Sequence, residues 1–365
     1  VASAAVAAQA QTANVTLYGY INTSIESNRG SNATGSKTLN RMTANSSRFG
    51  FRGSESLGGG MNAFFQLENS FGSDDGSLGG NVMWGREAWV GLNGGFGEVK
   101  VGYGLTPYDD VLGLSHQNIG STGLQNRNNG VSGGVGFGTQ QLFTNYGRGG
   151  TPGCGTDSNF DARAANAISY KSPNMGGLTI RTMYSLIEET SSGNCKLWDT
   201  SAVYANGPIT AGLTYAMHKD FRGLGGAAVG AHSENAWRVY GRYNFGAFRV
   251  DAAYDVASYK LATGTLKTKY WDVGAQVPMG AANFGLQYSQ RDNGTAWAWS
   301  PAVSYTAPTA AALNANWTNG GGKHISFVAD YRLSKRTQAY FYYSSMKNET
   351  GGKLNTPAIG IIHTF

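Results

Sequence analysis

Hydrophobic and polar side chains alternate along almost the whole chain. In the clearest stretch, one parity carries Trp237, Val239, Gly241, Tyr243 and Phe245, and the other carries Arg238, Tyr240, Arg242 and Asn244. After a turn at Gly246 the alternation resumes, with Phe248, Val250, Ala252, Tyr254 and Val256 against Arg249, Asp251, Ala253 and Asp255. Because strand side chains point alternately to the two faces of a sheet, this stretch predicts a hairpin with one apolar and one charged face.

Similar segments recur between clusters of Gly, Pro, Asn and Asp, and they predict sixteen strands. They are about ten residues long, the length that a tilted strand needs to cross a bilayer. The predicted strands are 14–26, 41–53, 61–70, 83–92, 97–104, 163–172, 177–188, 197–206, 208–218, 235–245, 247–259, 268–277, 282–291, 323–333, 337–347 and 356–365.

Short and long connections alternate between these strands. Short turns follow the even-numbered strands up to the twelfth, as at 93–96, 173–176 and Gly246. Long connections follow the odd-numbered strands, and the longest runs over 58 residues from Leu105 to Ala162. Tight turns on one rim and long loops on the other are typical of an outer-membrane barrel, whereas a sandwich or a propeller has no reason to keep this order.

The outward parity supplies an apolar band that includes Val15, Leu17, Ile21, Phe49, Phe51, Val99, Val101, Ile325, Phe327 and Tyr331. The chain has no run of 18 or more apolar residues, so it offers no transmembrane helix. It also shows no linker or change of composition along its 365 residues. The sequence therefore predicts an all-β fold, a 16-stranded antiparallel transmembrane β-barrel in one domain over 11–365.

Residues 1–10 are small and apolar and end in Ala8-Gln9-Ala10, which fits the tail of a secretory signal peptide that is cut before Gln11. An Ala-rich terminus without this role is the alternative. Export implies an oxidising compartment, where Cys154 and Cys195 can pair. A local staple between two loops is favoured over two free thiols, and a metal site made from two cysteines alone is not expected.

Several motifs together resemble the general trimeric porins of Gram-negative bacteria, in particular the beta-proteobacterial group. The residues that carry the resemblance are AsnValThrLeuTyrGlyTyr (14–20), SerSerArgPheGlyPheArgGly (46–53), TrpValGlyLeuAsnGlyGlyPheGlyGluValLysValGlyTyrGly (89–104), AlaAlaAsnAlaIleSerTyrLysSerProAsnMetGlyGly (164–177), LeuSerLysArgThrGlnAlaTyr (333–340) and the final IleIleHisThrPhe (361–365).

The resemblance implies a homotrimer in the outer membrane, in contact with lipid and lipopolysaccharide. Each subunit would have its own water-filled pore, narrowed by an inward-folded third long loop. A barrel of sixteen strands is too wide for its own side chains to fill, and 105–162 is long enough to occupy the lumen.

Charges of both signs have the inward parity. They are Arg48, Arg52, Lys100, Arg163, Lys171, Arg181, Arg238, Arg242, Arg249, Arg291 and Arg332, against Glu26, Glu68, Glu87, Glu98, Asp199, Asp251, Asp255, Asp272 and Asp330. Eleven bases against nine acids leave an excess of only two. The charges at the narrowest point, where screening by water is weakest, should therefore decide the selectivity.

The resemblance places an arginine cluster at that point, matching Arg48, Arg86 and Arg163, with Glu68 as the acidic partner. Arg52, which has the inward parity, is expected at the constriction as well. Strand parity puts Arg48, Arg52, Arg163 and Glu68 inward, but it puts Arg86 outward unless a bulge turns it in. An arginine in lipid at mid-depth costs about 2–4 kcal/mol, which favours the inward alternative. Asp109 and Asp110 in the third loop are expected to face the arginines across the gap. For each arginine, a solvated wall charge or a loop-to-wall salt bridge is the alternative.

Because an arginine ring attracts carboxylates and phosphates, we expect a general diffusion porin that passes small hydrophilic solutes and prefers small anions. The net charge of +6 agrees in sign. The alternatives are a channel specific for one substrate class, an enzyme built on a barrel and a secreted soluble β protein. No motif for a catalytic triad, a cofactor, a metal or a nucleic acid is present, so neither enzyme activity nor such partners are expected.

Overall fold

The computed structural model describes residues 14–32, 35–78, 82–115, 160, 163–186, 196–219, 231–261, 264–292, 322–348 and 353–365. The strands in these ranges are β1 (Asn14–Asn32), β2 (Gly35–Ala44), β3 (Arg48–Gly58), β4 (Met61–Ser70), β5 (Glu87–Gly94), β6 (Gly97–Leu105), β7 (Arg163–Lys171), β8 (Leu178–Leu186), β9 (Lys196–Asn206), β10 (Ile209–Lys219), β11 (Ala231–Asn244), β12 (Arg249–Leu261), β13 (Gly264–Met279), β14 (Ala282–Asp292), β15 (Gly322–Arg332), β16 (Thr337–Asn348) and β17 (Lys353–Thr364). A short helix, α1 (Tyr108–Leu112), and a 3-10 turn, η2 (Gly113–Ser115), follow β6. No helix in the described ranges has the length and apolar character needed to cross a membrane.

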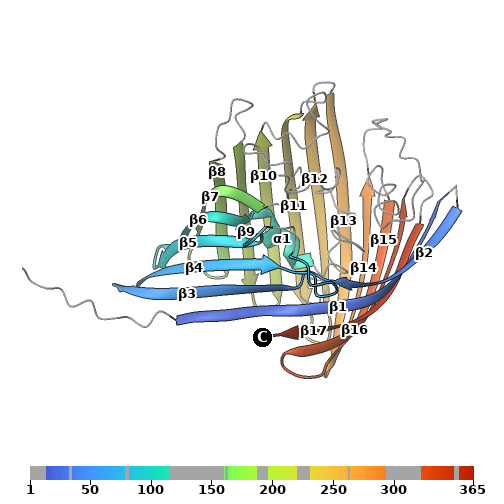
Figure 1. Cartoon of the computed structure of the whole chain (residues 1–365). Coiled ribbons are helices and arrows are strands. Elements are labelled where there is room, and N and C mark those ends of the chain that lie inside the picture. Colours follow the sequence, from blue (N-terminus) through green and yellow to red (C-terminus); the bar gives the residue numbers. More distant parts are fainter. Residues whose placement is uncertain are drawn as a thin grey trace, which may run out of the picture.

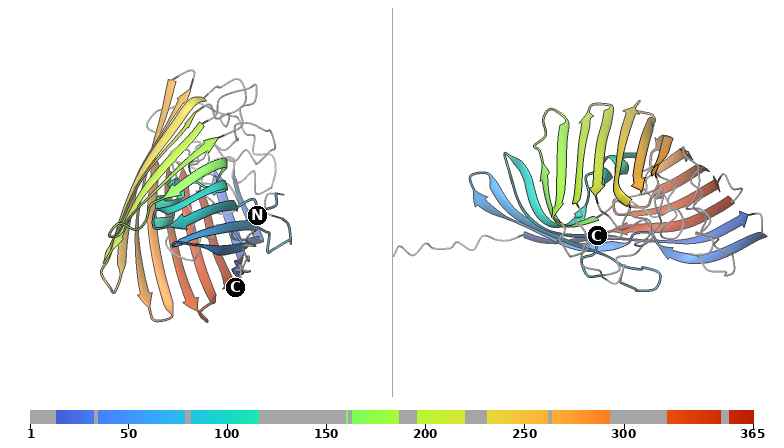
Figure 2. Two further views of the ribbon diagram at one scale, coloured as in Figure 1. Left: turned by 90° about the vertical axis from the view of Figure 1, so that its left-hand side faces the viewer. Right: turned by 90° about the horizontal axis from the view of Figure 1, so that it is seen from above.

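The strands form one closed antiparallel barrel (Figures 1 and 2). Strands β2 and β3 both pair with β1 and follow each other across a break at 45–47, so they make a single span of the wall. Counted in this way, the described residues form the sixteen predicted spans. Closure comes from β1 and β17, and at its end the backbone of Phe365 exchanges hydrogen bonds of 3.0 and 3.2 Å with that of Gly19.

The two faces of the wall follow the predicted alternation. Outward side chains are apolar and exposed, and Val15, Leu213 and Ile359 keep between 53 and 59% of their surface accessible. Inward side chains are polar or charged and largely covered, such as Asp272 and Arg238, which are fully buried. This is the arrangement of a barrel that has hydrocarbon outside and water within.

The connections after β1 and β12 are much shorter than the sequence predicts. Residues 27–40 fall between predicted strands, yet β1 runs to Asn32 and β2 begins at Gly35, with these two residues paired. Strands β12 and β13 likewise continue to Leu261 and Gly264. Long loops therefore do not follow every odd-numbered span. The backbone ladder continues in these hairpins past the apolar band, where neither face needs hydrophobic side chains and the sequence pattern fades.

A glycine makes the close contact between β5 and β6 possible. Gly102 has φ of +140°, and a Cβ there would lie 2.1 Å from the carbonyl oxygen of Ala88. The pairing of β6 with β7 shifts register directly after it, between Gly102 and Gly104. At Gly104 an added Cβ would meet the side chains of Glu87 and Trp89. Because Gly102 and Gly104 have no side chains, β5 and β6 can approach closely and the side chains of Glu87 and Trp89 can pack over Gly104.

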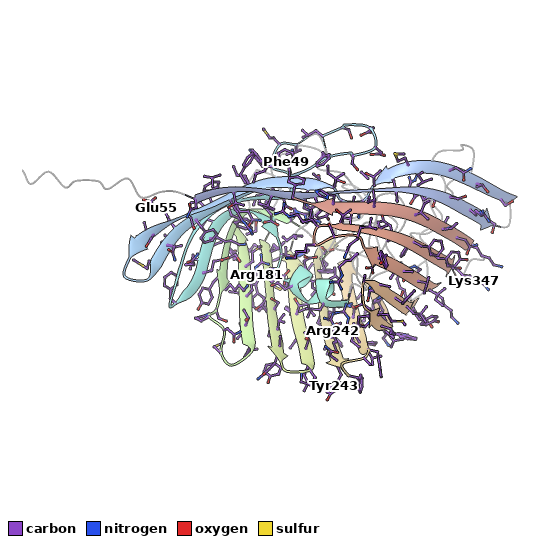
Figure 3. All side chains as sticks on the ribbon, turned by 90° about the horizontal axis from the view of Figure 1, so that it is seen from below. Phe49, Glu55, Arg181, Arg242, Tyr243 and Lys347 are labelled. Carbon is purple, nitrogen blue, oxygen red and sulfur yellow. The ribbon has the colours of Figure 1, made fainter. Side chains whose placement is uncertain are left out.

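Helix α1 lies inside the barrel against β9, β10 and β11 (Figure 3). Its side chains Tyr108, Val111 and Leu112 are fully buried. The described start of the third loop, 106–115, thus contacts the inner face of the wall. Most of the remaining loop lies outside the described residues, so the inward fold of the loop as a whole stays a prediction. The signal-peptide tail 1–10, Cys154 and Cys195 also lie outside the described residues, so cleavage before Gln11 and the pairing of the two cysteines stay predictions.

Candidate functional site

Glu68 on β4 is the centre of a cluster on the inner wall. It is 6% exposed and accepts hydrogen bonds from the Tyr18 hydroxyl at 3.1 Å and from Arg86 Nε at 2.6 Å. Arg48 Nη1 lies 3.5 Å from the same carboxylate. The structure therefore brings together Arg48, Arg86 and Glu68, the grouping that the resemblance implied, while their place at the constriction stays a prediction.

Arg86 points inward because it precedes β5 and does not belong to it. Strand β5 begins at Glu87, so the parity of that strand does not fix the direction of the preceding side chain. The backbone N–H of Arg86 donates to the carbonyl oxygen of Glu68 at 3.1 Å, which places the two residues side by side. Trp84, with φ of +58°, turns the chain just before this point. The inward alternative for Arg86 is correct, without the bulge that we considered.

Arg163 joins the cluster at the start of β7. Its Nε donates to the backbone carbonyl oxygen of Arg86 at 2.8 Å. This bond keeps the guanidinium beside Arg86 and does not neutralise its charge, because the acceptor is an uncharged carbonyl.

Arg48 and Arg52 each lie over the face of a tyrosine ring. The guanidinium carbon of Arg48 lies 4.6 Å from the centre of the Tyr20 ring, and that of Arg52 lies 5.1 Å from the centre of the Tyr18 ring. These are cation–π distances. A guanidinium group on an aromatic face keeps its charge. Arg48 also donates hydrogen bonds from Nη2 to the Tyr20 hydroxyl and from Nε to the Ser46 carbonyl oxygen at 3.3 Å.

The cluster carries an excess of positive charge. The guanidinium groups of Arg48, Arg86 and Arg163 lie together with the carboxylates of Glu68 and its register partner Glu87. Arg52 is connected to them through the Tyr18 ring, whose hydroxyl donates to Glu68. Among the residues that the structure describes, four cations against two anions leave two positive charges on this part of the wall. An anion in the lumen would find guanidinium donors whose hydrogen bonds to carboxylate or phosphate are strengthened by charge.

The third loop supplies acidic groups, but Asp110 does not pair with these arginines. Its Oδ1 accepts a hydrogen bond from Arg181 Nη1 at 2.9 Å, and its Oδ2 accepts one from the Ser201 hydroxyl at 2.8 Å. Both partners are inward side chains of β8 and β9, on the wall that α1 contacts. The expected pairing across the gap is therefore wrong for Asp110. For Asp109, whose backbone N–H donates to the Thr106 carbonyl oxygen at 3.2 Å, an orientation towards the arginines stays a prediction.

The family described as Gram-negative porin matches residues 1–351 of the sequence. The chain belongs to this porin family. It is 30% identical to outer membrane porin protein 32 of Delftia acidovorans over 99% of this chain and 91% of that protein. It is 24% identical to a major outer membrane protein P.IB of Neisseria meningitidis, over 97% of this chain and 94% of that protein.

Among solved structures, the anion-selective porin from Comamonas acidovorans superposes with a TM-score of 0.74. It is 26% identical, and the match covers 97% of this porin and all of that chain. These relatives place this porin in the outer membrane of a Gram-negative bacterium.

The anchorage of α1 is the part of the site that sequence reasoning missed. The Tyr108 hydroxyl donates to Asp255 at 2.7 Å, and its backbone N–H donates to Asp199 at 3.0 Å. Arg238, fully buried, pairs with Asp255 and lies 3.0 Å from Asp272. The inward parity identified all four charges, but nothing in the sequence linked them to a tyrosine in the loop. The one feature of the sequence that pointed to this cluster was the predicted hairpin, in which Arg238 and Asp255 are paired in register.

Beside α1 the porin has a basic cavity of about 340 Å³, lined by Lys100, Lys171 and Arg181 together with Glu98 and Asp110. Lys100 Nζ lies 3.7 Å from Glu98 and 4.8 Å from the centre of the Trp89 ring. Cations therefore also line the wall next to the helix.

No group of three His, Cys, Asp or Glu side chains within the described ranges is arranged to hold a metal ion. What the geometry of the described cluster offers is charge and hydrogen bonding to solutes in the lumen.

Proposed function

We propose that this porin is a general diffusion channel that passes small hydrophilic solutes and ions and prefers anions. Transport would be passive, with no catalytic step. The observation that carries the proposal is the cluster of Arg48 and Arg86 around the buried carboxylate of Glu68, with Arg163 held beside Arg86.

The physical reason is the screening inside a narrow passage. Two unit charges 4 Å apart interact by about 1 kcal/mol in bulk water and by about 4 kcal/mol at the lower effective dielectric near a protein surface. A cation that passes this group of guanidinium side chains meets a barrier of this kind, whereas an anion is attracted. The similarity to the Comamonas acidovorans porin, which is anion-selective, supports the same assignment.

We assign the constriction to Arg48, Arg52, Arg86, Arg163 and Glu68 on one wall, with Asp109 and Asp110 on the loop. Helix α1 narrows the lumen from the other side through its contacts with β9, β10 and β11. In this arrangement Asp110 acts on the bore by fixing the helix to Arg181, and the arginine cluster acts on the charge of the passing ion.

The proposal includes a homotrimer in contact with outer-membrane lipid and lipopolysaccharide. An aromatic cluster supports a subunit contact on the outer face of β3. Trp84 packs on Phe49 and Phe51 with ring centres 6.3 and 6.0 Å apart, and Phe71 lies 6.1 Å from Phe49. Aromatic residues are enriched in protein interfaces. Conductance that appears in steps of three would support the trimer.

The selectivity is tested by the reversal potential of the purified porin in a planar bilayer under a KCl gradient. We expect chloride to be favoured, each of Arg48→Gln, Arg86→Gln and Arg163→Gln to weaken the preference, and the triple variant to abolish it. Lys347→Gln, the same charge change on an exposed side chain, is the matched control and should leave the potential unchanged. A preference for potassium in the unaltered porin would overturn the proposal.

A further inference from the structure

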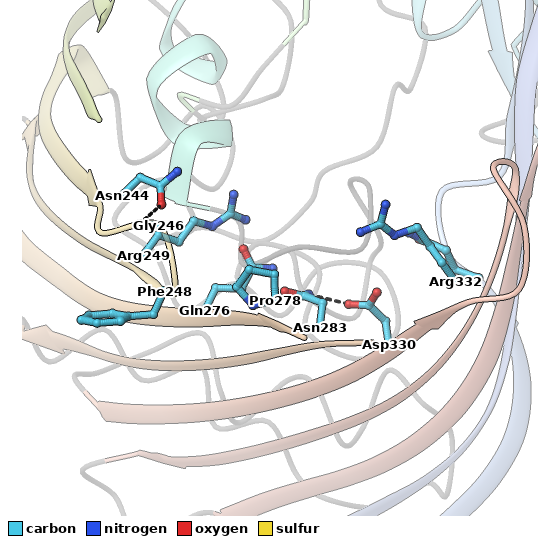
Figure 4. Close-up of a pocket in the computed structure, with 10 residues that line it drawn as sticks. Asn244, Gly246, Phe248, Arg249, Gln276, Pro278, Asn283, Asp330 and Arg332 are labelled. Carbon is cyan, nitrogen blue, oxygen red and sulfur yellow. Dashed lines mark hydrogen bonds between the residues drawn. The ribbon is translucent and has the colours of Figure 1, made fainter. Parts of the chain in front are cut away.

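A second cavity of about 340 Å³ lies at the rim that carries the short turns (Figure 4). It is lined by ten residues of β11 to β16 and of the turn at Gly246, among them Arg249, Gln276, Asn283, Asp330, Arg332 and Gln338. In outer-membrane barrels the short turns face the periplasm, so the cavity lies at the periplasmic mouth of the pore. Its volume falls at the lower end of the range for small-molecule sites.

Consecutive strands build this cavity through their register. Arg249 at the start of β12 is paired with Gln276 of β13, and Asn283 of β14 is paired with Asp330 of β15. Arg332 at the end of β15 is paired with Gln338 of β16. The two arginines therefore stand on opposite sides of the cavity, with amide side chains between them, and Figure 4 shows both guanidinium groups directed into it.

The charge of the cavity is positive. Among the described residues, no carboxylate lies within ion-pairing distance of Arg249 or Arg332. The one acid of the lining, Asp330, accepts a hydrogen bond from Asn283 Nδ2 at 2.6 Å, which fixes it on the wall. Two cations against one anion leave one positive charge, and both guanidinium groups keep their donors for a ligand.

We propose that this cavity binds an organic dianion with a carboxylate or phosphate group at each end. A guanidinium group binds such groups through two parallel hydrogen bonds, and a ligand that meets both arginines needs an acceptor at each end. The side-chain amides of Gln276 and Gln338 supply further hydrogen-bond donors to a ligand in the cavity. The site rests on the proposed function only in that solutes reach it through the water-filled lumen.

The test is calorimetric titration of the folded porin in detergent with the dicarboxylates malonate, succinate, glutarate and adipate. Binding at two fixed arginines predicts an optimum at one chain length, with acetate and succinamide weaker by about tenfold or more. Arg249→Gln and Arg332→Gln should each weaken the best ligand by about tenfold or more and remove the length optimum. The matched control is Lys335→Gln, which removes a positive charge from an exposed side chain of the neighbouring turn.

Asp330→Asn provides a change of opposite sign. It removes the only negative charge of the lining while its amide can still bond to Asn283, so we expect severalfold tighter binding, which a loss of structure would not produce. Equal binding of all chain lengths, or equal loss in the Lys335 control, would overturn the proposal. The titration measures binding in this cavity and does not depend on the ion selectivity of the pore. The reversal potential in KCl measures that selectivity and does not depend on what the cavity binds. The two proposals can therefore fail separately.

Discussion

Arg181 of β8 binds Asp110 of α1 through a hydrogen bond of 2.9 Å between Nη1 and Oδ1. A second nitrogen of the same guanidinium donates to the carbonyl oxygen of Leu105, where β6 ends and the loop begins. One inward side chain therefore fixes both the start of the third loop and its first helix. This contact, between segments that are 71 residues apart, is one of the bonds that hold α1 in the lumen.

Replacing Asp110 with Ala should loosen α1 from the wall. It removes the bonds to Arg181 and Ser201 and leaves a partly covered guanidinium without its carboxylate. We expect a changed single-channel conductance with more current noise, measured in a planar bilayer. Ser201→Ala, which removes only one of the two bonds, should give a smaller effect. Conductance equal to that of the unaltered porin would mean that Tyr108 and its partners are sufficient to position the helix.

Glu68→Gln should strengthen the preference for anions. The amide oxygen can still accept from Arg86, while the charge that offsets Arg48 and Arg86 is lost. The variant should also be less stable by about 1–3 kcal/mol, because the ion pairs with Arg48 and Arg86 become bonds between a charged donor and a neutral amide. The reversal potential in a KCl gradient measures the first effect. Glu55→Gln, the same change on an exposed side chain, is the control, and a shift of equal size there would exclude a local effect of Glu68.

Arg238→Met should destabilise the barrel strongly. It leaves Asp255 and Asp272 buried without the cation that both contact, and breaking a buried pair in this way costs about 3–5 kcal/mol. Urea unfolding in lipid or detergent measures the loss. The triple variant with Asp255→Asn and Asp272→Asn should recover most of it, because no buried charge is then left alone. If the triple variant is as unstable as the single one, packing of the arginine is the main contribution.

Gly102→Ala should impair folding, because the added Cβ would lie 2.1 Å from the carbonyl oxygen of Ala88 at a φ of +140°. Backbone strain of this kind costs about 1–3 kcal/mol, and the clash adds to it. Gly241→Ala is the matched control, since a Cβ there meets nothing within 4 Å. Refolding yield in detergent is the measurement, and equal yields for the two variants would contradict the strained position of Gly102.

The turn around Asp75 should loosen in acid. The Ser77 hydroxyl and its backbone N–H donate to the Asp75 carboxylate, the latter at 2.8 Å, and hold the pKa of that carboxyl below its ordinary value. Because the pKa is lowered in the folded state, the stabilisation is present above the unfolded value of about 3.9 and is lost as the pH falls through the folded one. The protection factor of the Ser77 amide, its exchange rate relative to the unstructured rate at the same pH, should fall in this range. Asp75→Asn should remove the dependence on pH.

The alternation of side chains predicted the strands and their faces well, because the face of a residue depends only on its neighbours in the same strand. A strand reverses the direction of its side chains at each residue, so the parity of Arg48, Glu68, Arg238 and Asp255 could be read from their neighbours. The same signal failed at 27–40, where the hairpin continues beyond the apolar band, and it gave the wrong direction for Arg86, because that residue precedes its strand.

The sequence by itself determined that a barrel forms, which residues face its lumen and that arginines are among them, because these properties depend on periods of two within short segments. Only the tertiary structure decided which side chains of the wall the third loop contacts. Asp110 binds Arg181, and Tyr108 binds Asp255 across 147 positions of the chain, because closure of the barrel and the path of the loop bring these groups together. The periodicity of a strand carries no information on such pairs, since it fixes the side of the wall and not the partner on it.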